Sequence, residues 1–287
     1  MKIIDTSSSA NQPFYSQDKR YALIFNGEIY NFLILKEKYF KDETFISNSD
    51  TELLLKGLIN FKEGFIKHLN GMFAFLFIDF QKNKIILARD RFGKKPLYIY
   101  EDSEKIIWSS EIKAILKVPK VKKEIDLNAI SEYLKRQYVP FPLTGFKNIK
   151  KFEQSSYQII RNGVAEKNEK YWSLDYCFKR KGNINELIEE FSIIMESSVN
   201  LRLISDVPLG VFLSGGIDSS IVAYISQKLS SKPIKTFSVG YTEGNKKYNE
   251  AELAKDFGDF IGSEHSSVYV NNNFCLLYTS DAADEED

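Results

Sequence analysis

The stretch Phe212-Leu213-Ser214-Gly215-Gly216-Ile217-Asp218-Ser219-Ser220 joins a short apolar run to a segment with helical spacing. Its adjacent glycines let the main chain approach a ligand, and its serine hydroxyls and the N–H groups of the following helix can donate to an oxyanion. An ordinary turn capped by Asp218 or Ser219 is the alternative, and for Ser-Gly-Gly alone it is the commoner outcome. In its setting we predict an anion-binding loop.

This loop is not a Walker A loop. A Walker A loop needs a lysine after its last glycine, and here Ile217 stands at that position. A loop without that γ-phosphate clamp suits a pyrophosphate that leaves as AMP is attached to a carboxylate.

The segments around the loop alternate between short apolar runs and helical patterns. We expect buried strands at Val207–Leu213 and Ile234–Val239 and helices at Ser219–Leu229 and Glu250–Ile261. This order predicts a parallel β-α-β-α sheet, whose strands meet nucleotides at their carboxyl ends.

A domain boundary is expected between Tyr176 and Gly182. The link Lys179–Gly182 is polar and contains glycine, and Asn183 with Glu186 three residues later is typical of a capped helix start. One face of that helix is apolar, through Ile184, Leu187, Ile188, Phe191, Ile194 and Met195. We therefore assign residues 1–178 and 183–274 to two domains.

The first half has the pattern of an antiparallel sheet. Turn signals at Gln81–Asn83, Glu101–Glu104 and Asn162-Gly163 separate its apolar runs, and helical spacing occurs at Thr51–Leu58 and Asn128–Leu134. The expected strands are Tyr21–Phe25, Phe73–Phe80, Lys84–Ala88 and Leu97–Tyr100. A sheet accompanied by helices is the result.

Composition excludes several classes of protein. Among the 287 residues, 39 are basic and 39 acidic, so no net field attracts nucleic acid. The 43% hydrophobic content is typical of a globular protein. Two cysteines, Cys177 and Cys275, and two histidines cannot form a repeated CxxC zinc site, so any metal must be held by oxygen.

Targeting signals are not apparent. The most apolar stretch, Met72–Ile78, is too short to cross a bilayer, and Met1–Thr6 lacks the features of a secretory signal. We expect a cytoplasmic protein with no membrane partner.

Residues 275–287 are set apart. Cys275–Glu285 resembles the translation of a sequencing adapter, which predicts that the natural protein continues differently beyond about Phe274. A genuine acidic tail is the alternative.

Several motifs in a fixed order resemble those of glutamine-hydrolysing asparagine synthetases. The SGGIDS loop resembles the PP-loop of AMP-forming ATP pyrophosphatases, and Ser205–Gly210 just before it also resembles this family. The similarity covers roughly residues 3 to 270. In the first half it rests on Asn26–Asn31, Ser49–Glu52, Ala88–Gly93 with Lys95–Tyr98, and Ser110–Lys113.

The resemblance implies an α/β and α+β chain: an αββα sandwich of the N-terminal-nucleophile type, then the start of a doubly wound parallel PP-loop domain. A leading cysteine would attack glutamine, with Asn26 and Gly27 as the oxyanion hole. Glutamine binding would involve Asn26, Gly27, Glu28 and Asp50, with Asp50 on the ammonium group. A hairpin turn at Asn26-Gly27 and a helix cap at Asp50 are the alternatives.

The resemblance also implies ATP and Mg²⁺ in the second half. Asp218 would hold Mg²⁺ on the ATP phosphates. Val239 could equally be core, and His265, expected in a loop, is assigned no role. The implied ATP-binding residues are Leu213, Ser214, Gly215, Gly216, Asp218, Ser219 and Val239.

The family reaction is ATP-dependent amidation of aspartate through β-aspartyl-AMP, with glutamine as the nitrogen donor. An amidotransferase acting on another carboxylate, such as a cell-surface sugar or a β-lactam precursor, and a degenerate non-catalytic binding or regulatory module stay open as alternatives. The implied partners are glutamine, aspartate and ATP, and a homodimer is left open.

The sequence departs from the family at its start. Lys2 follows Met1, where the family has its nucleophilic cysteine, and the arginine expected to bind the glutamine carboxylate would lie upstream of Met1. Cys177 lies at the domain boundary and is no substitute. We expect the chain, truncated at both ends, not to hydrolyse glutamine by the covalent route.

Overall fold

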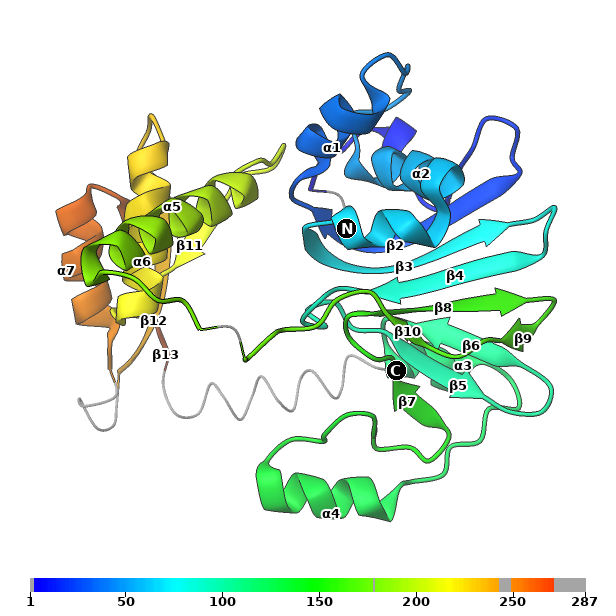
Figure 1. Cartoon of the computed structure of the whole chain (residues 1–287). Helices are drawn as coiled ribbons and strands as arrows, with labels where there is room; N and C mark the ends of the chain where they lie inside the picture. The colour runs from blue at the N-terminus through cyan, green and yellow to red at the C-terminus, as the bar shows by residue number, and fades with distance from the viewer. Residues whose placement is uncertain (1–2, 178, 243–248, 271–287) are drawn as a thin grey trace. The chain divides into compact units, whose positions relative to one another are not determined.

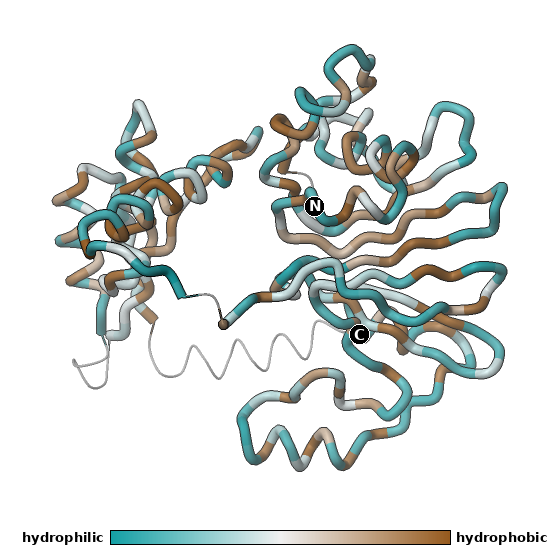
Figure 2. Tube along the Cα trace, viewed as in Figure 1, coloured by the Kyte–Doolittle hydropathy of each residue, from teal (hydrophilic) through white to brown (hydrophobic). Residues whose placement is uncertain are grey.

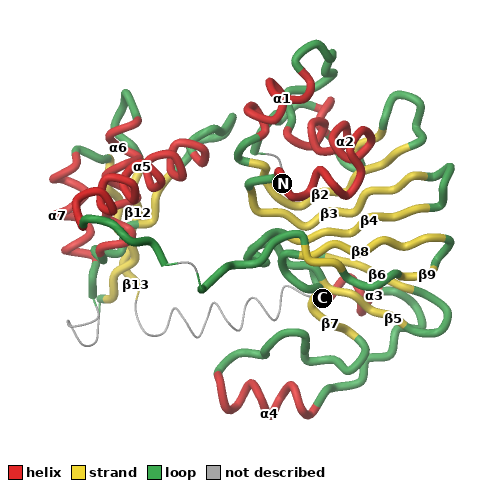
Figure 3. Tube along the Cα trace, viewed as in Figure 1, coloured by secondary structure: helices red, strands yellow, loops and turns green. Residues whose placement is uncertain are grey.

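The chain forms two compact units, Met1–Lys179 and Arg180–Asp287. Figure 3 shows that strands dominate the first unit and helices the second. The tail set apart at 275–287 lies outside the described residues. The computed structural model (Figure 1) describes residues 3–177, 179–242 and 249–270.

A seven-stranded antiparallel sheet forms the centre of the first unit, in the order β1-β2-β3-β4-β8-β10 with β9 paired to β8. The strands expected near residues 21, 73 and 84 are confirmed. Strand β2 runs past Asn26-Gly27, so this dipeptide is not a hairpin turn. The strands are β1 (Phe14–Tyr15), β2 (Tyr21–Ile29), β3 (Gly71–Asp79), β4 (Lys84–Arg89), β8 (Ser156–Arg161), β9 (Val164–Ala165) and β10 (Glu169–Lys170).

The predicted hairpin turns are confirmed. Gln81–Asn83 lies between β3 and β4, which pair antiparallel. Asn162 and Gly163 connect β8 to β9 with φ values of 52° and 80°, the left-handed region that a two-residue turn requires. Figure 2 shows hydrophilic residues at most of the turns and hydrophobic residues along the strands. Local turn chemistry therefore sets the register of this sheet.

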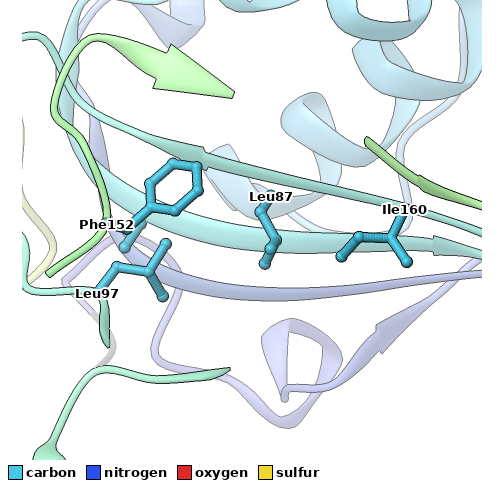
Figure 4. Packing of buried hydrophobic residues seen from close by; sticks show 5 residues of the cluster. Leu87, Leu97, Phe152 and Ile160 are labelled. Atoms are coloured by element: carbon cyan, nitrogen blue, oxygen red, sulfur yellow. The ribbon is translucent and has the colours of Figure 1, made fainter. Parts of the chain in front are cut away.

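A smaller antiparallel sheet, β6-β5-β7, packs on the large one. It consists of β5 (Tyr98–Glu101), β6 (Ile106–Ser109) and β7 (Ile149–Lys151). Figure 4 shows part of the cluster between the sheets, with Phe152 beside Leu97. This buried cluster comprises Ala74, Leu87, Leu97, Phe152 and Ile160.

Helices cover the outer faces of the two sheets (Figure 1). Helix α2 (Asp50–Phe61) packs against β1 and β2, and α1 (Phe32–Phe40) packs on α2. On the other side, α3 (Ile112–Lys117) packs on the small sheet around Tyr100, which is fully buried. The layers run helix, sheet, sheet, helix, as predicted. The remaining helices of this unit are η1 (Ser8–Ala10), η2 (Lys62–His68) and α4 (Leu127–Arg136).

The second unit contains a three-stranded parallel sheet in the order β11-β12-β13, the start of the predicted parallel domain. The expected capping box at Asn183 and Glu186 is confirmed at the start of its first helix. Its elements are α5 (Ile184–Arg202), β11 (Gly210–Phe212), α6 (Ile217–Leu229), β12 (Lys235–Tyr241), α7 (Ala251–Ile261) and β13 (Glu264–Val270).

Two expectations for this unit were wrong. The buried strand expected at Val207–Leu213 is only Gly210–Phe212, because Val207 lies in a turn in which its N–H donates to Ser205 Oγ (3.1 Å). Phe212 is 83% exposed. His265 lies in β13 and not in a loop, since the parallel pairing with β12 extends through this position.

Helices in the described part of the chain do not combine the length and the apolar character that a membrane span requires.

Candidate functional site

The open edge of β2 carries an unoccupied main-chain donor. Strand β1 pairs only with the first part of β2, so further along the N–H groups of alternate residues point away from β3 toward no strand. The N–H of Phe25 donates to Gln12 Oε1 (2.7 Å), and that of Ile29 donates to Asp50 Oδ2 (2.8 Å). The N–H of Gly27, between them, meets no acceptor among the described residues. It is therefore free to bind a ligand.

Gly27 contacts β3 directly through its main chain. A Cβ at this position would lie 2.1 Å from Met72 O and 2.7 Å from Phe73 Cα. No side chain fits there without moving β3. Glycine is thus required by the close approach of two backbones, and the position of β3 determines the position of the Gly27 N–H.

Asn26 presents a side-chain donor beside this main-chain donor. It lies on the same face of the sheet as its partner Ala74, which is the face toward the small sheet. Its Nδ2 donates to Ser110 Oγ (3.1 Å), just after β6. The second Nδ2 proton meets no acceptor in the described part of the chain. Asn26 and Gly27 can therefore offer one N–H each.

Asp50 lies next to this edge at the start of α2. The helix cap is Ser49, whose Oγ accepts the N–H of Thr51 (3.1 Å), so the cap role considered for Asp50 is wrong. Asp50 is 5% exposed, and burial raises the pKa of its carboxyl from 3.8 to about 6. The hydrogen bond from Ile29 acts in the opposite direction. When ionised, this carboxylate can pair with an ammonium group.

Glu28, Gly27 and Asp50 share the wall of one small pocket. Its free volume is about 10 Å³, so an amino acid can enter only if the wall moves. The pocket is lined by Ile3, Ile4, Ala10, Gln12, Phe25, Gly27, Glu28, Ser49, Asp50 and Thr51.

The second candidate site is the loop between β11 and α6. Its hydroxyls close it on itself: the N–H of Ser214 donates to Ser219 Oγ (3.2 Å), and the two hydroxyls lie 3.0 Å apart. Ser219 Oγ also donates to Gly216 O (3.1 Å). The N–H of Gly216 donates to Ser214 Oγ (3.4 Å), so these bonds together fix the curvature of the loop.

The glycines of this loop and the start of α6 suit an anion. Gly215 has φ of 75°, and a Cβ there would lie 2.9 Å from Leu253 Cβ of α7. Gly216 is the N-cap of α6 and offers no capping side chain, so neither Asp218 nor Ser219 is the cap. The first N–H groups of α6 and its positive end therefore remain available to a phosphate. Asp218 is exposed in the first turn.

The flanking apolar residues divide into core and surface. The side chain of Leu213 is 2% exposed and packs against Ala223 and Ala254, so contact with a nucleotide is open only to its main chain. Val239 on β12 is 54% exposed, on the face that carries Phe212. Val239 is therefore not core within the described chain.

Gln12 and Ser110 are site residues that the sequence left without a role. Ser110 belongs to one of the quoted motifs, but only the packing of the small sheet on the large one brings it to Asn26. Gln12 stands outside those motifs, and no sequence pattern marks a side-chain amide as the partner of a strand edge.

Comparison with known proteins defines the class. The model of the glutamine amidotransferase domain matches residues 1–172, and that of asparagine synthase matches residues 190–284, which includes most of the tail set apart above. The chain belongs to the family of glutamine-hydrolysing asparagine synthetases, in which a glutamine amidotransferase domain precedes an ATP-dependent ligase domain.

Its relatives are longer proteins. Over 272 residues, 94% of this chain, it is 35% identical to asparagine synthetase [glutamine-hydrolyzing] 1 of Bacillus subtilis; the match covers 42% of that protein. It is 33% identical to asparagine synthetase [glutamine-hydrolyzing] 3 of the same organism, in a match that covers 92% of this chain and 44% of that protein. It is 30% identical to amidase chry2 of Gibberella zeae, in a match that covers 91% of this chain and 41% of that protein. The chain thus spans less than half the length of these relatives.

Among solved structures, the chain is similar to the glutamine phosphoribosylpyrophosphate amidotransferase of B. subtilis. The TM-score is 0.42 and the identity 16%, and the match covers 92% of this chain and 65% of that one.

The raised pKa of Asp50 predicts a pH-dependent stability of the first unit. Between about pH 4 and pH 6 the folded state keeps the proton that the unfolded state has released, so stability falls as pH rises and levels off above pH 6. Compared with Asp50→Asn, the wild type should lose about 2.4 kcal/mol from pH 4 to pH 7, at 1.36 kcal/mol per pKa unit, because the unfolded carboxyl has already released part of its proton at pH 4.

Urea unfolding followed by tryptophan fluorescence measures this difference, because both tryptophans, Trp108 and Trp172, lie in the first unit. Parallel stability curves for the two proteins would contradict the burial of an ionisable carboxyl at this position.

Proposed function

We propose that this chain carries the glutaminase part and the beginning of the nucleotide-binding part of an asparagine synthase. The reaction converts aspartate, ATP, glutamine and water to asparagine, AMP, pyrophosphate and glutamate. One observation carries the glutaminase assignment: the free N–H of Gly27, between two N–H groups of the same strand edge that side chains occupy.

In the glutaminase step of a longer protein, the thiolate of the family's N-terminal cysteine would attack the amide carbon of glutamine, and the carbonyl oxygen becomes negative. The N–H of Gly27 and the second Nδ2 proton of Asn26 donate to this oxygen, which preorganises the site for the transition state. Ammonia then leaves, and water releases glutamate from the thioester. Ionised Asp50 pairs with the ammonium group of glutamine, with Glu28 in the same pocket wall.

In the ligase step, the loop Ser214–Ser219 binds the phosphates of ATP through the first main-chain N–H groups of α6. The carboxylate of Asp218 is exposed and has no hydrogen-bond or ion-pair partner among the described residues. Those residues contain no cluster of three acidic, histidine or cysteine side chains that could hold a metal alone. This donor set fits Mg²⁺, which takes one or two carboxylates, substrate phosphates and waters. Mg²⁺ would offset the phosphate charge near Asp218.

Aspartate is the acceptor that we propose, through β-aspartyl-AMP, with the reaction in the cytoplasm and a homodimer as the assembly. The name of the B. subtilis relatives supports the acceptor, and only the acceptor.

The oxyanion assignment predicts a selective defect. In a longer protein that carries the N-terminal cysteine of the family, Asn26→Ala should lower kcat for glutamine hydrolysis by roughly 10² to 10³, the loss expected for one oxyanion donor. Ammonia-dependent asparagine formation should stay nearly unchanged. Glutamate release and asparagine formation are measured separately. Ser110→Ala is the matched control, because it removes the partner of Asn26 and leaves the donor, so its effect should be much smaller. An equal loss of both activities in Asn26→Ala would make Asn26 structural.

The phosphate assignment predicts the opposite selectivity. In the same longer protein, Asp218→Asn should abolish pyrophosphate release with glutamine or ammonia as nitrogen donor and spare glutamine hydrolysis. The N-terminus of a helix favours phosphate, but the negative charge of an aspartate in the first turn repels it. The two can lie close together only with a cation between them. Helix capping is unaffected, because Gly216 is the N-cap. Pyrophosphate release across a Mg²⁺ titration is the measurement, and wild-type turnover in the variant would refute the role of this carboxylate.

A further inference from the structure

The carboxylate of Asp90 is fully used by the main chain around it. Asp90 is 1% exposed. One oxygen, Oδ1, accepts the N–H groups of Phe92 (3.0 Å) and Lys94 (2.9 Å). The other, Oδ2, accepts those of Phe73 (3.1 Å) and Lys95 (2.9 Å). With two donors on each oxygen, this carboxylate has no capacity left for a substrate, so Asp90 is not a catalytic residue.

Asp90 forms hydrogen bonds with both main-chain groups of Phe73, its N–H and its carbonyl oxygen. Besides accepting the N–H of Phe73, it donates its own N–H to Phe73 O (2.8 Å). The last regular pair between β3 and β4 is Ala74 with Arg89, so Asp90 continues the attachment of β3 one position beyond the ladder. Hydrogen bonds to an ionised acceptor are about twice as strong as neutral ones. The hydrogen bonds with Asp90 therefore determine the position of the Phe73 main chain.

Phe73 in turn lies opposite Gly27. Its Cα would be 2.7 Å from a Cβ on Gly27, so the two backbones touch with no side chain between them. A shift of Phe73 therefore moves Gly27, and with it the N–H on the far edge of β2.

We propose that Asp90 is a positioning residue for the oxyanion hole, acting through Phe73 on the N–H of Gly27. This inference rests on the proposed glutaminase function for its chemical meaning. Arg89 stabilises the loop that follows Asp90. Its guanidinium donates to the carbonyl oxygens of Lys95, Gly93 and Phe152 at 2.7 to 2.8 Å.

Without ligand, the test uses the 287-residue chain labelled with ¹⁵N. The titration with L-glutamine uses a ¹⁵N-labelled longer protein that carries the N-terminal residues of the family, with alanine in place of the nucleophilic cysteine. Asp90→Asn is the variant, because an amide keeps the shape but replaces one acceptor oxygen by a donor. Ser155→Ala is the matched control: it removes the bond from Ser155 Oγ to Arg91 O (3.0 Å) in the same loop and leaves the carboxylate in place.

Without ligand, Asp90→Asn should speed hydrogen exchange of the Phe73 amide roughly tenfold or more, which corresponds to about 1.4 kcal/mol, and should move the Gly27 amide resonance. Ser155→Ala should do neither. An unmoved Gly27 resonance in Asp90→Asn, or equal changes in both variants, would overturn the positioning role. If Asp90→Asn does not fold, Asp90→Glu replaces it, since it keeps the charge and displaces the oxygens by one methylene.

The glutamine titration separates this inference from the proposed function. A Gly27 resonance that responds to glutamine in the wild type, but at roughly tenfold higher concentration in Asp90→Asn, supports both. Equal responses in the two proteins would overturn the positioning role alone. A Gly27 resonance that does not respond to glutamine in the longer protein with Asp90 intact would refute the glutamine site, while the measurements without ligand would still decide whether Asp90 positions Gly27.

Discussion

The contact between the backbones of β2 and β3 at Gly27 is the constraint on which the first unit depends. A Cβ there would meet Met72 O at 2.1 Å, so only glycine allows the two central strands to keep this approach. The same strand edge then exposes one N–H between the neighbours that Gln12 and Asp50 occupy. The fold and the candidate chemistry therefore share one requirement, which is a residue without a side chain at position 27.

Much of the fold could be predicted because its signals are local. Asn162-Gly163 and Asn183 with Glu186 define a turn and a helix start within a few residues, and both are confirmed. Asn26 and Gly27 were predicted through the resemblance to a family. The roles of Gln12 and Asp90 could not be predicted, because the bonds from Phe25 to Gln12 and from Phe73 to Asp90 join segments that only the folded sheet brings together.

Predictions for the second unit were less accurate where tertiary packing competes with local pattern. The apolar run Val207–Leu213 has the composition of a buried strand, yet the Ser205 turn shortens it and leaves Phe212 exposed. The side chain of Leu213 is buried against α6 and α7, so the expected contact with a nucleotide stays a prediction for its main chain. The hydroxyls of Ser214 and Ser219 bond within the loop itself, and its role as an anion cradle stays a prediction.

Transfer of labelled nitrogen tests the central claim most directly. A longer protein that joins this chain to the N-terminal cysteine and the remaining ligase domain of the family would receive glutamine labelled with ¹⁵N in its amide, together with ATP and aspartate. The account predicts ¹⁵N-asparagine, detected by mass spectrometry, with equimolar pyrophosphate. Labelled ammonia that accumulates without asparagine, or asparagine formed without pyrophosphate, would contradict it.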